Sequence, residues 1–242
     1  KEDPDVGAFI QERLESEGIR IHTGTAAKGV KRLNGTLHLD LQRMNPGAEN
    51  GDIHSLETQA LLIAAGRIPN VENLGLEAAG VAHDKGGIRV NDYLQTSQSH
   101  IYACGDIVGP YQFTHMADHQ ARVIVRNILM PFKLLRQKVD YSVVPWCTYT
   151  SPEVARVGLN ETEAEENGIK YDLYTQEIGE MDRAIVEREE AGFAKVLTEK
   201  GGDKILGATI VSEHAGDLLH EFVLAMKIGA GLRDIASTVH TY

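Results

Sequence analysis

Hydrophobic and polar positions follow a helical period near the start of the chain. Apolar side chains recur three or four positions apart over residues 6–17, and Gly18 follows as a helix stop. Residues 19–23 then alternate apolar and polar, as a strand does. Residues 29–33 and 36–41 are predicted to be antiparallel strands, because the Asn34-Gly35 pair between them is a strong hairpin signal. A polar loop over 46–52 and an apolar, strand-like run over 59–65 complete this unit.

The middle of the chain combines short elements with one long helix. Residues 74–81 are predicted to form a short helix and a turn, and residues 86–90 a turn that feeds a short strand. Residues 100–104 are an apolar and aromatic run, typical of a short buried strand. Residues 116–130 carry small and branched apolar side chains along one side of a predicted helix, and residues 131–140 are interpreted as a linker.

The last hundred residues begin with strands and end with helices. Extended segments are predicted over 143–150 and 157–159, and a capped helix is predicted over 162–166. Three strands are then expected over 170–174, 192–198 and 205–212, followed by one helix over 214–226 and another that begins at Leu232. Gly201-Gly202 supplies the turn between the last two strands. The helix over 214–226 is strongly amphipathic, so one of its sides is expected to pack against other apolar residues.

Composition excludes several classes of partner. The chain has 242 residues, enough for one large domain or two small ones, and its 42% hydrophobic content supports a packed core. The net charge of −11 argues against nucleic acid and anionic membranes as main partners. No apolar run approaches the roughly 18 residues needed to span a bilayer.

Cys104 and Cys147 are far apart and form no Cys-x-x-Cys pair, so we interpret them as buried, reduced thiols of a cytoplasmic protein.

The predicted strand over 100–104 leads into Gly105-Asp106. Ligands of open α/β sheets bind beyond the carboxyl ends of strands, where glycine permits a close backbone approach and a carboxylate accepts hydrogen bonds from hydroxyl groups. Gly-Asp is also a common turn pair, so a ligand site and a plain turn both fit these residues. His115 and His119 lie one helical turn apart, but we expect no metal there, because zinc usually needs three or four ligands.

The residues around this pair resemble the second FAD motif of the class I pyridine nucleotide-disulfide oxidoreductases. The resemblance covers Thr96-Ser97, residues 101–106, His115 to Ala117 and Gln120-Ala121. It implies that Asp106 holds the ribityl chain of FAD, with Gly105 beside it. It also implies that Gln112, Phe113, Thr114 and His115 pass close to the flavin and open the next helix. The N–H groups at a helix start suit an electron-rich flavin edge.

Residues 64–70 match the signature that closes the NAD(P)-binding domain of this family. The match places a nicotinamide-side contact on Gly66 and, more weakly, puts Ala27 near the dinucleotide; a plain strand-to-loop turn at Gly66 stays open. The implied fold is α/β and α+β. It comprises the second half of an NAD(P)-binding Rossmann-like domain (1–68), the C-terminal part of an FAD-binding domain (69–139) and a dimerisation domain (140–242). The Gly-rich cofactor turns and the redox cysteine pair are expected to lie before Lys1.

The last domain resembles the interface domain of the same family. Its recurrent elements are Pro152-Glu153-Val-Ala155, Val157-Gly158 and Gly207-Ala-x-Ile210. In family members this domain forms most of the homodimer contact and presents a catalytic loop to the flavin of the other subunit. We therefore expect a homodimer formed through residues from about 143 onward, although each apolar residue on the helix over 214–226 also fits an ordinary core.

The chain ends in Val239-His240-Thr241-Tyr242, where family members carry a His-x-His-Pro-Thr-x-x-Glu pattern. His240 matches the first histidine of this pattern, and we interpret it as a structural neighbour of the site more than as the catalytic base. Tyr242 stands at the position of the second histidine, which is the catalytic acid-base of the family. Tyrosine titrates near pH 10 and histidine near neutrality, so Tyr242 is a poorer acceptor of a thiol proton at pH 7. Mercuric reductases and soluble transhydrogenases also carry tyrosine around this point.

The sequence thus predicts part of an FAD-dependent NAD(P)H:disulfide or metal-ion oxidoreductase. A mercuric reductase-like enzyme is favoured; dihydrolipoamide dehydrogenase and soluble transhydrogenase are the alternatives. The implied reaction passes hydride from nicotinamide to FAD, then to a cysteine disulfide and on to a small-molecule or disulfide substrate. A hypothesis of another class is a non-catalytic fragment that dimerises without flavin, and we expect the fragment alone to be inactive. The substrate and the choice between NADH and NADPH stay open.

Overall fold

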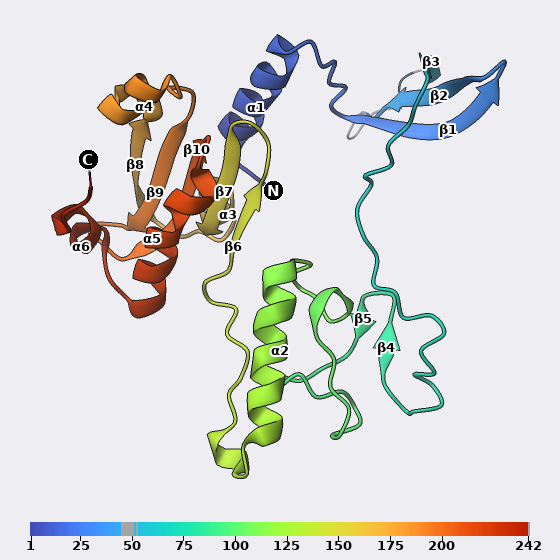
Figure 1. The fold of residues 1–242 in the computed structure, drawn as a ribbon, viewed down its shortest axis with the longest axis vertical. Helices are drawn as coiled ribbons and strands as arrows, with labels where there is room; N and C mark the ends of the chain where they lie inside the picture. The colour runs from blue at the N-terminus through green and yellow to red at the C-terminus, as the bar shows by residue number, and fades with distance from the viewer. Residues whose placement is uncertain (45–50, 52, 242) are drawn as a thin grey trace. The chain divides into compact units, whose positions relative to one another are not determined.

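The computed structural model describes residues 1–44, 51 and 53–241. The chain divides into two compact units, one formed by Gln11–Arg67 and the other by Lys1–Ile10 together with Ile68–Tyr242. Helix α1 (Pro4–Ser16) begins in the larger unit and ends in the smaller one (Figure 1). Its bounds confirm the helix expected over 6–17.

The smaller unit contains a three-stranded antiparallel sheet in the order β1-β2-β3 (Figure 1). Strands β1 (Thr25–Leu33) and β2 (Thr36–Arg43) pair as far as Leu33 and Thr36, so Asn34 and Gly35 alone make the turn. Both turn residues have a positive φ, 50° and 86°, the combination that a two-residue type I′ hairpin requires. The predicted hairpin is therefore confirmed.

Two other strands predicted in this unit are wrong. Residues 19–23 and 59–65 have no strand structure, and the third strand is instead β3 (Ile53–Thr58), which pairs with β2. Backbone pairing defines a strand, and in the described part of the chain the run over 59–65 pairs with none. Its Leu62 is 89% exposed. Except for Gly51, the loop expected over 46–52 lies outside the described residues.

Residues 68–113 form turns and a short hairpin around a small core. Strands β4 (His83–Asp84) and β5 (Gly87–Ile88) match the turn and strand expected near residue 86. The helix expected over 74–81 is a series of turns. The strand expected over 100–104 is reduced to one bridge, between Gln95 and Tyr102, and is followed by the 3-10 turn η1 (Gly105–Ile107). Its apolar residues pack beside Leu76, Val81 and Ile88, so burial in this core explains the run without a sheet.

Helix α2 (Thr114–Leu129) confirms the long helix expected over 116–130, and the short η2 turn (Lys133–Leu135) follows it. The buried side of α2 carries Met116, Gln120, Val123, Ile124 and Asn127. Two of these five side chains are amides, which need hydrogen-bond partners when they are buried. The residues after α2 supply some of those partners, as described below.

The last hundred residues form a five-stranded antiparallel sheet in the order β6-β7-β10-β9-β8 (Figure 1). Its strands are β6 (Pro145–Thr148), β7 (Glu153–Gly158), β8 (Tyr171–Glu177), β9 (Phe193–Glu199) and β10 (Ile205–Ser212). Its helices are α3 (Glu161–Glu166), α4 (Asp182–Glu187), α5 (Ala215–Ile228) and α6 (Leu232–Ser237), and η3 (Ile178–Glu180) precedes α4. The sequence missed α4 and η3, and the other elements lie within a few residues of their predicted bounds.

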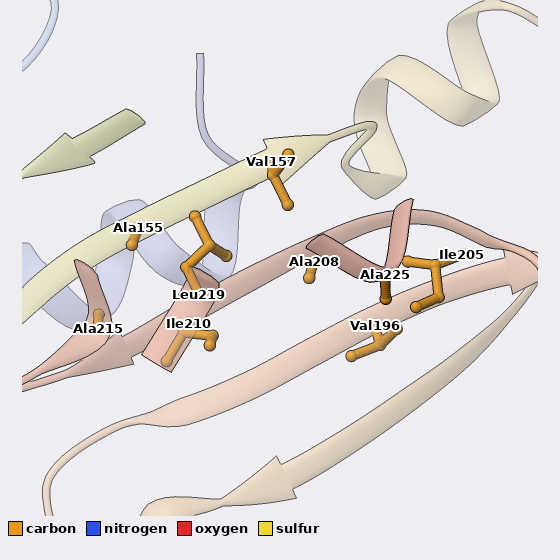
Figure 2. Packing of buried hydrophobic residues seen from close by; sticks show 9 residues of the cluster. All are labelled: Ala155, Val157, Val196, Ile205, Ala208, Ile210, Ala215, Leu219 and Ala225. Carbon is orange, nitrogen blue, oxygen red and sulfur yellow. The ribbon is translucent and has the colours of Figure 1, made fainter. Parts of the chain in front are cut away.

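Helix α5 covers one face of this sheet with an apolar core (Figure 1). Alternate residues of β7 and β10, among them Val157 and Ile210, point to this face, as the two-residue period of a strand requires. Leu219 of α5 is 1% exposed within the cluster. Figure 2 shows nine of the clustered side chains gathered between α5 and strands β7, β10 and β9.

The opposite face buries charged side chains beside the start of the chain. Lys195 of β9 is 3% exposed, and its Nζ donates to carboxylates of Asp3, Asp5 and Glu161 at 2.8–3.0 Å. Val6 of α1 packs beside these pairs, on Val154 and Val211. The first residues of the chain are therefore bound to the last domain by ion pairs and by apolar contact.

Candidate flavin site

The Gly105-Asp106 pair forms the tight turn η1 against helix α2. Gly105 is buried with a φ of +79°, a region in which glycine is favoured, and its N–H donates to Oε1 of Gln120 at 2.6 Å. A Cβ on Gly105 would lie 3.2 Å from the Cβ of Ala117, so the turn and the helix already touch. Asp106 is partly buried in this turn. The turn therefore fixes the position of the backbone that carries the Asp106 carboxylate, the group that the resemblance assigns to FAD.

The start of α2 is suited to an electron-rich group. Phe113 is extended at the N-cap and makes no side-chain cap, and the first turn carries no acidic side chain. The N-terminus of a helix carries a partial positive charge and backbone N–H groups that lack intrahelical partners. Gln112 and Phe113 precede this helix start, and Thr114 and His115 open it. These four residues therefore lie at the end of α2 that touches the η1 turn through Ala117.

An aromatic cluster joins this helix start to β6. The ring of Phe113 stacks on His115, with centroids 5.2 Å apart, and on Trp146, at 6.2 Å. The Nε2 of His115 lies 2.9 Å from the carbonyl oxygen of Pro145, so in this hydrogen bond Nε2 carries the proton and donates. Tyr111 stacks on the other side of the same segment, 6.1 Å from Phe113. Three of these residues precede or open α2, so the cluster fixes that segment against the last domain.

A pocket of about 760 Å³ lies beside this cluster. Its walls include Tyr111, Phe113, Tyr141 and Trp146, together with the buried Arg156. The guanidinium of Arg156 lies 4.4 Å from the Trp146 ring centroid and pairs with Glu163 at 2.8 Å. The positive charge of Arg156 is therefore paired within the protein, and the pocket wall combines aromatic, aliphatic and polar side chains.

The two residues assigned to the nucleotide lie in the smaller unit, whereas Asp106 lies in the larger. Gly66 is exposed with a φ of +100°, which fits a turn that favours glycine. Ala27 is exposed on β1. Both nucleotide roles stay predictions.

At the other end of the chain, His240 is bound to helix α5. Its Nε2 lies 2.8 Å from Oε1 of Glu221, and this hydrogen bond, with the charge of Glu221, raises the pKa of the His240 imidazole. The side chain is half exposed. Tyr242, the other residue assigned to catalysis, lies outside the described residues.

The described residues include no cluster of three or more His, Cys, Asp or Glu side chains placed to hold a metal. Among the described helices, none combines the length and the apolar content that a membrane crossing requires. Sequence reasoning did not single out the contacts of Gln120, Tyr141, Trp146 and Glu221. Of these four residues, only Gln120 was named from the sequence, as part of the resemblance to the FAD motif.

Comparison with known proteins agrees with this arrangement. The family model of the pyridine nucleotide-disulphide oxidoreductases matches residues 1–121, and that of their dimerisation domain matches residues 144–242. The chain is 34% identical both to mercuric reductase of Staphylococcus aureus, over 99% of this chain, and to mitochondrial dihydrolipoyl dehydrogenase of Dictyostelium discoideum, over 98%. It covers 42% and 48% of those two proteins, so it spans about half the length of the curated relatives it matches or somewhat less.

A solved structure shares the fold. The HOCl-induced flavoprotein disulfide reductase RclA from Escherichia coli superposes with a TM-score of 0.86 and 25% identity, over 100% of this chain and 53% of that one. The mixed α/β arrangement of the chain is thus that of a flavoprotein reductase domain set followed by a dimerisation domain. The chain belongs to the pyridine nucleotide-disulphide oxidoreductase family.

Proposed function

We propose that this chain is the C-terminal half of an FAD-dependent NAD(P)H oxidoreductase that acts on a disulfide or a metal ion. The observation that carries the proposal is the junction of the η1 turn with the start of α2. There a carboxylate, a glycine with positive φ and an uncapped helix start lie together. This set fits a ligand that has both hydroxyl groups and an electron-rich ring, as FAD does.

Each residue of the junction has a distinct task in this proposal. Asp106 accepts hydrogen bonds from ribityl hydroxyl groups, and Gly105 lets the flavin approach the backbone. The segment from Gln112 to His115 lies beside the isoalloxazine ring, where the positive end of α2 stabilises added electron density. When bound, FAD would supply the redox chemistry between NADH or NADPH and the substrate. Gly66 and Ala27 belong to the nicotinamide side.

We favour a mercuric reductase-like activity over dihydrolipoamide dehydrogenase or soluble transhydrogenase, because Tyr242 stands where the family carries its catalytic histidine. A phenol with an ordinary pKa of about 10 exchanges protons with thiols poorly at neutral pH, yet it donates a hydrogen bond well. The relatives leave this choice open, because mercuric reductase and dihydrolipoyl dehydrogenase sequences match at the same 34% identity. Assays of NAD(P)H-dependent reduction of Hg²⁺, lipoamide and a second pyridine nucleotide separate the three activities.

The proposal includes a homodimer formed from about residue 143 onward. Helix α5 covers the sheet with one side and also exposes Leu218 (49%), Leu224 (61%) and Ile228 (70%). Apolar side chains exposed along one helix are typical of an interface, and a stable one buries more than about 1,000 Å². We place the protein in the cytoplasm, where the unpaired Cys104 and Cys147 stay reduced.

The first experiment is a visible absorption spectrum of the purified full-length protein, followed by anaerobic addition of NADH or NADPH. We expect a flavin band that is bleached by one of the two nucleotides. A flavin-loaded sample that neither nucleotide reduces contradicts the proposal. A flavin-free dimer in sedimentation velocity supports the competing hypothesis of a non-catalytic dimerisation fragment, and a monomer excludes that hypothesis.

A further inference from the structure

We propose that Gln120 and Tyr141 are positioning residues that set the conformation of the η1 turn, and through it the affinity for FAD. The proposal rests on the proposed function, because it assumes that the turn binds the flavin. Neither residue is assigned a flavin contact. Their effect passes through Gly105, whose N–H is the point at which the turn is held.

Gln120 bridges two segments with its two amide atoms. Its Oε1 accepts from Gly105 N at 2.6 Å, and its Nε2 donates to the Tyr141 hydroxyl at 2.9 Å. The side chain is fully buried, with 0% exposure. A backbone N–H can only donate, so it fixes which end of the amide faces the turn. Both ends of a buried amide are thus satisfied by partners of different segments.

Tyr141 carries the connection back to the helix start. It lies on the segment that leads from α2 into β6, and its ring is 5.9 Å from Tyr111. Tyr111 in turn stacks on Phe113 at 6.1 Å. The path from Gly105 through Gln120, Tyr141 and Tyr111 therefore ends at the N-cap of α2. It joins the two halves of the proposed flavin site, the turn and the helix start, through the segment that precedes the dimerisation sheet.

The same helix offers a matched control. Asn127, one heptad further along α2, is also fully buried, and its amide makes two hydrogen bonds of 2.8 Å with the backbone of Gln137. Like Gln120, it bonds to the segment between α2 and β6. The two hydrogen bonds of Asn127 go to Gln137, whereas Gln120 bonds to the η1 turn. A purely structural role for buried amides on α2 predicts equal consequences at both positions, whereas a positioning role predicts a difference in flavin binding.

The test compares variants of the full-length protein by their stability and by their dissociation constant for FAD. We expect Gln120→Leu to weaken FAD binding about 10-fold or more, because the buried Gly105 N–H loses its acceptor, and Tyr141→Phe to weaken it about 3-fold or more. Gln120→Glu keeps an acceptor for Gly105 and can accept from Tyr141, so it should restore binding to within about 3-fold of the parent. Asn127→Leu should lower the melting temperature and leave the FAD dissociation constant unchanged.

A second readout does not depend on flavin. Amide hydrogen exchange of peptides that cover residues 100–110 should be faster in Gln120→Leu than in Asn127→Leu. Equal exchange in these two variants, or equal FAD affinity in them at a temperature where both are folded, overturns the inference. If the parent protein binds no FAD, the proposed function fails, and the exchange experiment still decides whether Gln120 holds the turn.

Discussion

The Nζ of Lys195 lies 2.9 Å from Oδ2 of Asp3, and each side chain is only 3% exposed. The two residues are 192 positions apart in the sequence. The contact therefore closes the chain on itself, from the segment before α1 to a central strand of the last sheet.

Replacing Lys195 should be costly. In Lys195→Met, the carboxylates of Asp3 and Glu161 lose their common cation, and breaking a buried ion pair from one side costs about 3 kcal/mol. The free energy of unfolding from urea titration measures the loss. Lys200→Met is the control, because Lys200 is 63% exposed and its pair with Asp172 is worth less than about 1 kcal/mol. Equal losses in the two variants contradict the assignment.

Asp3 should make the protein sensitive to acid. Burial opposes ionisation of this carboxyl, but hydrogen bonds from Thr162 and Lys195 outweigh burial and lower the pKa of Asp3. Because the pKa of Asp3 is lower in the folded than in the unfolded state, its ionised carboxylate stabilises the fold at every pH above the unfolded value of about 3.9. This stabilisation is lost as the pH falls through the lower, folded-state pKa. Unfolding free energies measured from pH 6 down to pH 2 should fall less steeply in Asp3→Asn than in the parent.

Cys147 should be an inert thiol. Burial, helped by the neighbouring Glu153 carboxylate, raises the pKa of Cys147 to about 11 from an ordinary 9.0. Alkylation requires the thiolate, so a two-unit rise slows the reaction about 100-fold at pH 8. The rate of iodoacetamide labelling should be followed at Cys147 itself, by peptide mass spectrometry of the Cys104→Ser variant. The same variant unfolded in guanidinium serves as the control, and equal rates in the native and unfolded states exclude the predicted protection.

His240 should titrate above its ordinary range. The Glu221 carboxylate raises the pKa of His240, so the pair is complete below the unfolded pKa of about 6.5 and is lost as the pH rises through the folded value. An NMR titration of the His240 ring should show this rise, and Glu221→Gln should remove it. Glu213→Gln changes a glutamate that bonds to Ser151 instead, and it should leave the titration of His240 unchanged.

Asp106 should determine how well the protein retains FAD. Loss of a charge-assisted hydrogen bond in Asp106→Ala should weaken FAD binding by about 1.5–3 kcal/mol, that is, roughly 10-fold to 150-fold. Asp118→Ala is the control, because Asp118 is an exposed residue of α2 paired with Arg122. Equilibrium dialysis with the apoprotein measures both constants. An unchanged FAD affinity in Asp106→Ala rules out the ribityl role.

The helices and strands that were predicted correctly are those in which the local conformational preference of the residues and their packing favour the same structure. Asn34-Gly35 can adopt the left-handed turn that a tight hairpin demands, and the apolar period of α5 matches the side that it buries. In α2 the helix was predicted but its buried side was not, because Val125 and Ile128 of the apolar side are exposed. The strand predictions for 59–65 and 100–104 were wrong because an apolar run does not by itself supply the paired neighbour that a strand needs. Residues 61–65 are exposed, whereas Ile101 and Ala103 pack in a small core without a sheet. The η1 turn at Gly105-Asp106 lies where the motif placed it, although no strand leads into it.

The partners of the site residues could not be read from the sequence. Gln120 belongs to the residues that carry the resemblance to the FAD motif, but its bond to Gly105 spans 15 positions and its bond to Tyr141 spans 21. Such pairings depend on how the segments pack. The same holds for Glu221 and His240, which are 19 positions apart.

The buried charges on one face of the last sheet restrict how this protein can recombine with its relatives. On the α5 face, apolar side chains of similar volume can replace one another, so a homologous segment can be accepted there. On the other face, Lys195 depends on the carboxylates of Asp3 and Asp5, nearly two hundred residues away. A chimaera that exchanges the last domain should therefore exchange the first few residues with it, because the buried lysine of one stretch is paired with carboxylates of the other.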